Sequence, residues 1–202
     1  RTTARALGPL SHDRFPLPES GQEYPIVGLF DSGTDRSNAA LQAWVADRVD
    51  WHPSEEQDNS HGSFVGGLIA NGRSLNHDSP RFPNAACKLV DIVVFDKSGE
   101  AEESDLLTFF KQALTDFPHV KVWNLSLALA GVACDPLEVS EFGAAIDSLQ
   151  REFGVLFVNA AGNMAEPPFR KWPVEETFAG QDRLAPPADS VRSLTVGGLA
   201  PE

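Results

Sequence analysis

Cysteine is scarce in this sequence, which has only Cys87 and Cys134 among its 202 residues. Two cysteines cannot form the disulfide framework of a small secreted scaffold, and neither stands in a pair spaced for a metal. We expect Cys87, which precedes an apolar run, to be buried, and Cys134 to lie in a loop. The sequence leaves open whether a disulfide joins the two, and a reducing compartment is compatible with the composition.

Basic side chains are also few. The sequence has 16 Lys and Arg residues against 29 Asp and Glu residues, so its net charge is −13. Nucleic-acid surfaces need clustered Lys and Arg, and we therefore expect no nucleic-acid partner. The acidic excess would favour basic partners, although solubility alone also explains it. We expect no membrane span, because no apolar run approaches the roughly 20 residues that cross a bilayer.

Glycine-rich phosphate-binding motifs are absent as well. The sequence contains neither Gly-x-Gly-x-x-Gly nor a Walker motif, and the turn that follows Asp31 offers a single glycine. This argues against a nucleotide-binding doubly wound domain. A phosphotransferase with Asp31 as its nucleophile would leave His61 and Asn163 unexplained.

Five short runs rich in Val, Ile, Leu and Phe predict strands of a covered parallel sheet, because they are apolar on both faces. They are Ile26–Phe30, Leu89–Phe95, Val120–Leu125, Val155–Asn159 and Val191–Val196. Helical patterns between them predict crossover connections. The sequence therefore predicts an α/β domain from residue 25 onward, with a mostly parallel central sheet and helices on both faces, preceded by an N-terminal arm at residues 1–24.

Three helices are predicted between these strands. The first runs from His61 to Ala70 with Ser60 as its N-cap, and its small residues would let it pack closely against neighbours. The second has Ser104 as its cap. The third opens at Asp135-Pro136 and ends at Gly154.

Three polar side chains stand at the ends of predicted elements. Asp31 ends the first strand, His61 opens the first helix, and Asn163 follows the fourth strand. Ligands bind beyond the carboxyl ends of the strands in such sheets, so we expect the three residues to share one edge. An acid, a base and an amide donor are the parts of an acyl-transfer site.

The segments that carry these residues resemble the motifs of subtilisin-like serine peptidases (subtilases, peptidase S8), in the order aspartate, histidine, asparagine. They read Phe-Asp-Ser-Gly at 30–33, His-Gly-Ser-Phe-Val-Gly-Gly at 61–67 and Ala-Ala-Gly-Asn at 160–163. Residues 124–128 resemble the strand that lines the primary specificity pocket, and residues 184–198 resemble the loop and strand after the oxyanion asparagine. The resemblance implies a subtilisin-like fold and a serine endopeptidase acting on peptides or proteins.

The resemblance also implies a role for each residue. Asp31 would accept a hydrogen bond from His61, which would take the proton of a serine hydroxyl, and the Asn163 amide would donate to the oxyanion. An extended peptide would bind as an added strand. The residues expected to contact it are Ser126, Leu127, Ala128, Gly99, Glu100, Ala161 and Gly162.

No cofactor is required by the resemblance, and the sequence shows no metal-type spacing of histidines. Calcium often stabilises this family; Asn76, Asp78 and Asn84 could contribute to a structural site, or could belong to an ordinary polar loop. The acidic residues between Glu100 and Asp105 could favour basic substrates, or could simply suit the start of a helix.

The family's nucleophile is missing. It lies in a Gly-Thr-Ser motif downstream of the last predicted strand, and this sequence contains no Gly-Thr-Ser. We therefore expect residues 25–202 to form a partial subtilase catalytic domain, with the serine beyond Glu202 and the 202-residue chain inactive by itself. The alternative is a catalytically dead subtilase-like module that binds extended peptides.

Some residues depart from the family pattern or could be mistaken for the nucleophile. We expect Ser32, Ser63 and Cys134 to be structural rather than nucleophilic. Phe64 stands where a second histidine is common, and we expect it to pack in the core. Ala128 stands where a glycine is common, and its methyl group could narrow the substrate pocket.

Overall fold

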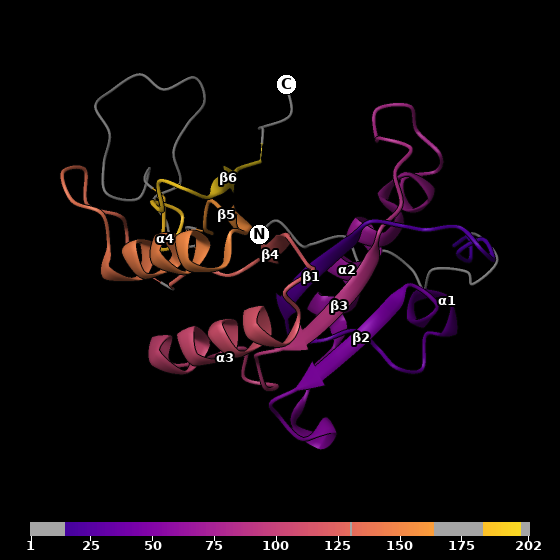
Figure 1. The fold of residues 1–202 in the computed structure, drawn as a ribbon, viewed down its shortest axis with the longest axis horizontal. Coiled ribbons are helices and arrows are strands. Elements are labelled where there is room, and N and C mark those ends of the chain that lie inside the picture. Colours follow the sequence, from indigo (N-terminus) through magenta and orange to yellow (C-terminus); the bar gives the residue numbers. More distant parts are fainter. Residues whose placement is uncertain (1–14, 130, 164–183, 199–202) are drawn as a thin grey trace, which may run out of the picture.

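The computed structural model describes residues 15–129, 131–163 and 184–198. Its helices and strands alternate along most of the chain (Figure 1). In order they are β1 (Ile26–Asp31), α1 (Ala39–Gln42), β2 (Val45–Asp50), a 3-10 turn η2 (Ser54–Glu56), α2 (Ser60–Leu75), β3 (Lys88–Val93), α3 (Glu103–Asp116), β4 (Val122–Leu125), α4 (Glu141–Phe153), β5 (Leu156–Ala160) and β6 (Leu194–Val196). The predicted arm at residues 1–24 lies partly outside the described residues, so its boundary stays a prediction.

The strands of the described residues form one six-stranded sheet in the order β2-β3-β1-β4-β5-β6, and every pairing among them is parallel. The α/β class predicted from the sequence is confirmed. Successive strands extend the sheet on one side of β1 and then on the other, so the direction of winding changes between β1 and β4. The carboxyl ends of strands beside such a switch point frame the usual ligand crevice of an open α/β sheet.

Aromatic side chains form the core on the sheet face that α3 and α4 cover (Figure 1). Phe30 of β1 lies at its centre, with its ring 4.7 Å from that of Trp123 and 4.5 Å from that of Phe110. Phe157 of β5 packs on the same cluster. This packing anchors β1, which ends at Asp31.

Helix α2 covers the opposite face of the sheet. Its buried residues are Gly62, Gly66, Gly67 and Ala70, as the close-packing prediction required. A Cβ atom on Gly66 would lie 3.0 Å from the Thr34 methyl group and 3.3 Å from side-chain atoms of Leu29 and Leu89, so a larger residue would fit only if these neighbours shifted. The N-terminus of α2 is thereby held close to the end of β1.

Beside α2, the same face of β4, β5 and β6 exposes an apolar strip. It consists of Val122, Leu156, Leu194 and Val196, whose exposed fractions lie between 36% and 54%. The register places them on one face, because Val122 pairs with Leu156, Val158 with Leu194, and Ala160 with Val196.

Several helix starts differ from the predictions. Helix α2 takes Asn59 as its N-cap rather than Ser60, and α3 takes Glu102 rather than Ser104. Helix α4 begins at Glu141 and not at Asp135-Pro136, because the Ser140 hydroxyl accepts a hydrogen bond from the Gly143 amide. The predicted stop at Gly154 is confirmed, with the left-handed φ of 62°.

Two strand predictions also need correction. β2 was not predicted, because this edge strand carries polar residues at half of its positions. β6 begins at Leu194 and not at Val191, because the Asp147 carboxylate accepts hydrogen bonds from the amides of Val191 and Arg192 and holds them in a bend.

Phe64 and the cysteines differ in part from expectation. The prediction that Phe64 packs in the core is wrong, since 52% of it is exposed. Cys87 is half-buried, Cys134 is buried in a loop, and neither forms a disulfide. In the described parts of the chain, no helix is both long and apolar enough to cross a membrane.

Candidate active site

Asp31 is the last residue of β1 and is almost fully buried. Asp31 pairs with Val93 of β3, and its carbonyl accepts a hydrogen bond of 2.9 Å from the Val94 amide, whereas the pairing with β4 ends one residue earlier, at Phe30. One carboxylate oxygen, Oδ1, accepts a hydrogen bond of 2.8 Å from the Ser32 amide. Burial and these contacts leave the carboxylate few ways to turn.

His61 stands in the first turn of α2, directly above the turn that follows Asp31. Gly62 makes this approach possible, because a Cβ atom there would lie 2.2 Å from the Gly33 carbonyl oxygen. Two hydrogen bonds join the same segments. The Asn59 side-chain amide donates to the Ser32 carbonyl at 2.7 Å, and the Gly62 amide donates to the Ser32 hydroxyl at 3.3 Å.

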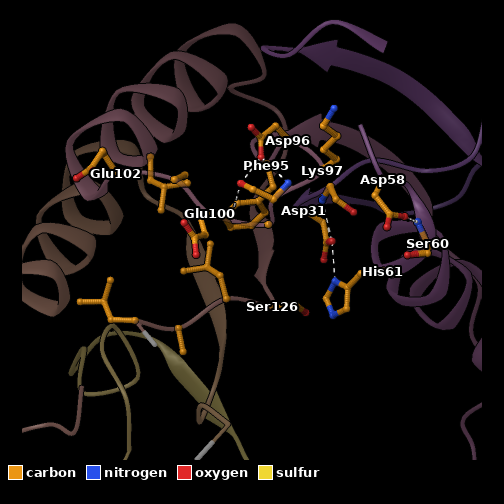
Figure 2. A pocket seen from close by; sticks show the side chains of 18 residues that line it. Asp31, Asp58, Ser60, His61, Phe95, Asp96, Lys97, Glu100, Glu102 and Ser126 are labelled. Atoms are coloured by element: carbon orange, nitrogen blue, oxygen red, sulfur yellow. Dashed lines mark hydrogen bonds and ion pairs between the residues drawn. The ribbon is translucent and has the colours of Figure 1, made fainter. Parts of the chain in front are cut away.

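The structure brings Asp31 and His61 into direct contact. Nδ1 of His61 lies 2.7 Å from Oδ1 of Asp31 (Figure 2). An ionised carboxylate only accepts hydrogen bonds, so we assign the proton to Nδ1. In the neutral ring Nε2 then carries a lone pair that can accept a proton, and the side chain is 59% exposed to solvent.

The contact changes the acidity of the imidazole. The hydrogen bond to Asp31 raises the pKa of His61 above 6.5, partial burial opposes this, and the negative charge of Asp31 adds to the rise. Because the folded-state pKa is raised, the pairing contributes its full stability below the unfolded pKa, and this contribution is lost as pH rises through the folded pKa. A base function for His61 needs the neutral ring, so it would gain as pH rises through the same pKa.

We expect Asp31→Asn to lower the pKa of His61, because the substitution removes the charge and weakens the hydrogen bond to the imidazolium. The measurement is a pH titration of the His61 ring protons by NMR, in the wild type and in the variant. His119 serves as the internal control, since it precedes β4 and so lies near the amino end of that strand, whereas Asp31 stands at the carboxyl end of β1. Unchanged His61 titration in Asp31→Asn would contradict the contact.

A cleft of about 830 Å³ opens beside the pair. Figure 2 shows Asp31 and His61 on one side of it and Glu100 and Glu102 on the other. One wall is the continuous segment 95–102 after β3, and another is the segment 126–129 after β4. Five of the predicted substrate residues line it, namely Gly99, Glu100, Ser126, Leu127 and Ala128.

The wall that contains Gly99 is a hydrogen-bonded turn. The amides of Ser98, Gly99 and Glu100 donate to the Asp96 side chain, the Asp96 carbonyl and the Ser98 hydroxyl, respectively. Those amides are thus engaged inside the turn, and a peptide bound along this wall would meet its carbonyl groups first. The acidic residues also suit the start of α3, whose first turn contains Glu103 and Asp105.

Ala161, Gly162 and Asn163 follow β5 at the same edge of the sheet, but they are not among the residues that line the cleft. The Ala161 amide donates to the Val196 carbonyl at 2.9 Å, and its carbonyl accepts from Ala185 at 3.0 Å. Gly162 has a φ of 102° and packs against Ala185, where a Cβ atom would lie 2.6 Å from that of Ala185. Asn163 is exposed. The substrate and oxyanion roles of these residues stay predictions.

The nearby hydroxyl and thiol groups have structural partners. The Ser32 hydroxyl accepts from the Gly62 amide, and the Ser63 hydroxyl accepts from the Asp35 amide at 2.8 Å. The Ser126 hydroxyl accepts from the Asn124 side chain at 2.8 Å. Burial, with the Asp189 carboxylate nearby, raises the pKa of Cys134 to about 11, so this thiol is protonated at neutral pH.

The predicted calcium ligands lie at the end of α2 and in the loop after it. Asn76 is the C-cap of α2 and donates its side-chain amide to the Gly72 carbonyl at 2.7 Å, while Asp78 is exposed. Within residues 15–129, 131–163 and 184–198, no three His, Cys, Asp or Glu side chains gather in a way that could hold a metal. Calcium binding stays a prediction.

Sequence reasoning missed two residues that contact the turn after Asp31. Arg48 of β2 and the buried Asp91 of β3 both contact Thr34, three residues after Asp31. The signal was available, because Asp91 is a lone carboxylate inside an apolar run and such a group requires a partner.

The comparisons with known proteins agree on the fold. The sequence profile of the subtilase family (peptidase S8) matches residues 23–202. Among solved structures, a chain from the subtilase cytotoxin SubAB assembly matches with a TM-score of 0.54 and 16% identity, covering 87% of this chain and 55% of that one. MycP1 with its N-terminal propeptide removed matches with a TM-score of 0.51 and 18% identity, covering 94% and 60%.

A cold adapted subtilisin-like serine proteinase gives a TM-score of 0.44 and 19% identity, covering 76% of this chain and 55% of that one. No curated protein sequence matches the chain. At these identities the structural likeness concerns the fold, and the chain spans about half the length of the structures it matches.

Proposed function

Since the chain belongs to the subtilase family, we propose that it supplies the acid, the base and the oxyanion donor of a serine endopeptidase site. Family and fold indicate a serine peptidase, which acts on peptides or proteins. The observation that carries the finer proposal is the 2.7 Å contact between His61 Nδ1 and Asp31 Oδ1 at the wall of the cleft.

In the proposed reaction, a serine from outside these 202 residues attacks the peptide carbonyl. His61 takes the hydroxyl proton on Nε2 and later gives it to the leaving amine. Asp31 accepts the Nδ1–H bond throughout, which fixes the ring orientation and stabilises the imidazolium. The Asn163 amide donates to the oxyanion, a contribution of about 2.7–4 kcal/mol where it was measured in a subtilisin, a relative of this chain.

The substrate would lie extended in the cleft between segments 98–100 and 126–128. Main-chain recognition of this kind tolerates many sequences. The proposed hydrolysis needs no cofactor, and calcium, if bound near Asn76 and Asp78, would have a structural role.

The proposal is tested by labelling the protein that contains these 202 residues in its natural length with a fluorophosphonate, which reacts with activated serines. We expect covalent labelling of the natural protein, loss of labelling in His61→Ala, and retention in the control His119→Ala. Labelling indifferent to His61 would contradict the proposed base. Absence of labelling in the natural protein, together with saturable peptide binding, would favour a peptide-binding module without hydrolysis.

A further inference from the structure

Arg48 of β2 is an almost buried arginine whose side chain is 10% exposed. Its guanidinium donates hydrogen bonds to four residues, of which three lie outside β2. The acceptors are the Thr34 carbonyl, Asp91 Oδ2 at 3.1 Å, Gln57 Oε1 at 2.9 Å and Asp50 Oδ1 at 3.0 Å. A planar guanidinium with five N–H groups in fixed directions can satisfy such a set, whereas an ammonium group cannot.

The central acceptor, Asp91, lies in β3 and is fully buried. Its Oδ2 atom also accepts from the Thr34 amide at 2.9 Å and from the Thr34 hydroxyl at 2.6 Å. Burial raises the pKa of Asp91, and the hydrogen bonds from Thr34 and the charge of Arg48 oppose that rise. A charge this deeply buried is tolerated only with such partners, so the pair and Thr34 form one unit.

The partners of this unit lie on both sides of the Asp31–His61 contact. Thr34 belongs to the turn that follows Asp31. Gln57 precedes His61, and its Oε1 atom also accepts from Asn59, the N-cap of α2, at 3.3 Å. Asn59 in turn donates to the Ser32 carbonyl.

Side chains fill the space between the turn after β1 and the segment that leads into α2. A Cβ atom on Gly33 would lie 2.9 Å from Arg48 Nη2 and 3.0 Å from Asn59 Nδ2. The turn after β1 is therefore packed against the guanidinium on one side and the start of α2 on the other.

We propose that Arg48 and Asp91 are positioning residues that set the spacing of Asp31 and His61 by joining the turn after β1 to the segment that leads into α2. Neither residue lines the cleft, so they act through the pair and not on substrate. As a statement about geometry the proposal stands independently of hydrolysis, and as a contribution to catalysis it rests on the proposed function.

The test is Arg48→Lys, which keeps the charge and removes the planar set of donors. The matched control is Arg36→Lys, because Arg36 is 60% exposed and also pairs with Asp50. For each protein the His61 ring is titrated by NMR and the melting temperature is measured. Asp31 and the other ionisable groups of the cleft are the same in all of them; these are Asp58, Asp96, Lys97, Glu100 and Glu102.

We expect Arg48→Lys to lower the pKa of His61, as we expect for Asp31→Asn, and Arg36→Lys to leave that pKa where it is in the wild type. In the active protein, Arg48→Lys should lower kcat about 10- to 100-fold with KM little changed, since a misplacement near 1 Å costs about 100-fold. If Arg48→Lys does not fold, Asp91→Asn provides the same comparison with a side chain of equal size.

The outcome that would overturn the proposal is specific. A folded Arg48→Lys or Asp91→Asn variant in which only the melting temperature falls, while His61 titrates as in the wild type, would make this unit a stabiliser of the β2–β3 edge and nothing more. This result could occur with or without fluorophosphonate labelling, so it is distinguishable from failure of the proposed function.

Discussion

Replacing His61 with alanine in the active protein should lower kcat by about 10⁶-fold, as removal of the corresponding histidine does in a subtilisin. The reason is the contact described above. Nδ1 is engaged by Asp31 at 2.7 Å, so Nε2 is the nitrogen available to move the proton. Without it, the serine hydroxyl keeps its proton at neutral pH and is a weak nucleophile. The measurement is steady-state hydrolysis of a chromogenic peptide.

Asp31→Asn is measured in the same experiment. It should lower kcat by about 10⁴-fold, because the ring loses its preferred tautomer while Nε2 remains. The double variant Asp31→Asn/His61→Ala should be no slower than His61→Ala alone, since residues that act as a unit are not additive. A loss below about 100-fold for His61→Ala would remove the histidine from the proposed chemistry.

The substitution Gly62→Ala should destabilise the fold by about 3 kcal/mol or more, the upper end of what overpacking costs. The added methyl group would lie 2.2 Å from the Gly33 carbonyl oxygen and 2.7 Å from the Gly33 nitrogen, and backbone atoms cannot turn aside as a side chain does. For a chain of this size, that loss lowers the melting temperature by about 6–12 °C. Moving α2 away from the turn should also break the contact between Asp31 and His61.

Gly72→Ala is the control, because Gly72 lies in α2 beyond the kink at Asn71, where φ is −161°, and a Cβ atom there would meet nothing within 4 Å. Its stability should stay within about 1 kcal/mol of the wild type, since only helix propensity changes. Thermal unfolding and the His61 titration are measured for both variants. If Gly62→Ala melted like Gly72→Ala, the close approach of α2 to the turn would be refuted.

The sheet was predictable where strands are buried on both faces. β1 and β3 are such strands, and their apolar runs are continuous. β2 escaped detection because an edge strand needs no such run, and its Asp47 and Asp50 are polar. Helix starts were missed for a related reason: a cap is chosen by contacts with other segments, as when Asn59 at the start of α2 bonds to the turn after β1.

Some residues of the candidate site could be predicted from the sequence and others could not. Asp31 was predictable because it ends a strand, and parallel strands place their carboxyl ends at one side of the sheet. His61 was predictable because it opens the next predicted helix. Arg48 and Asp91 are 43 residues apart, and nothing local to either residue names the other. Phe64 was misassigned, because its apolar character indicated burial while the helix turned it toward solvent.

The two borders of the described sheet are unlike. β2 carries Asp47 and Asp50, and charges on a border strand oppose further pairing. β6 reads Leu-Thr-Val, has no charge, and continues the apolar strip. Lateral growth of this sheet by another strand is therefore directional: it is opposed beyond β2 and favoured beyond β6.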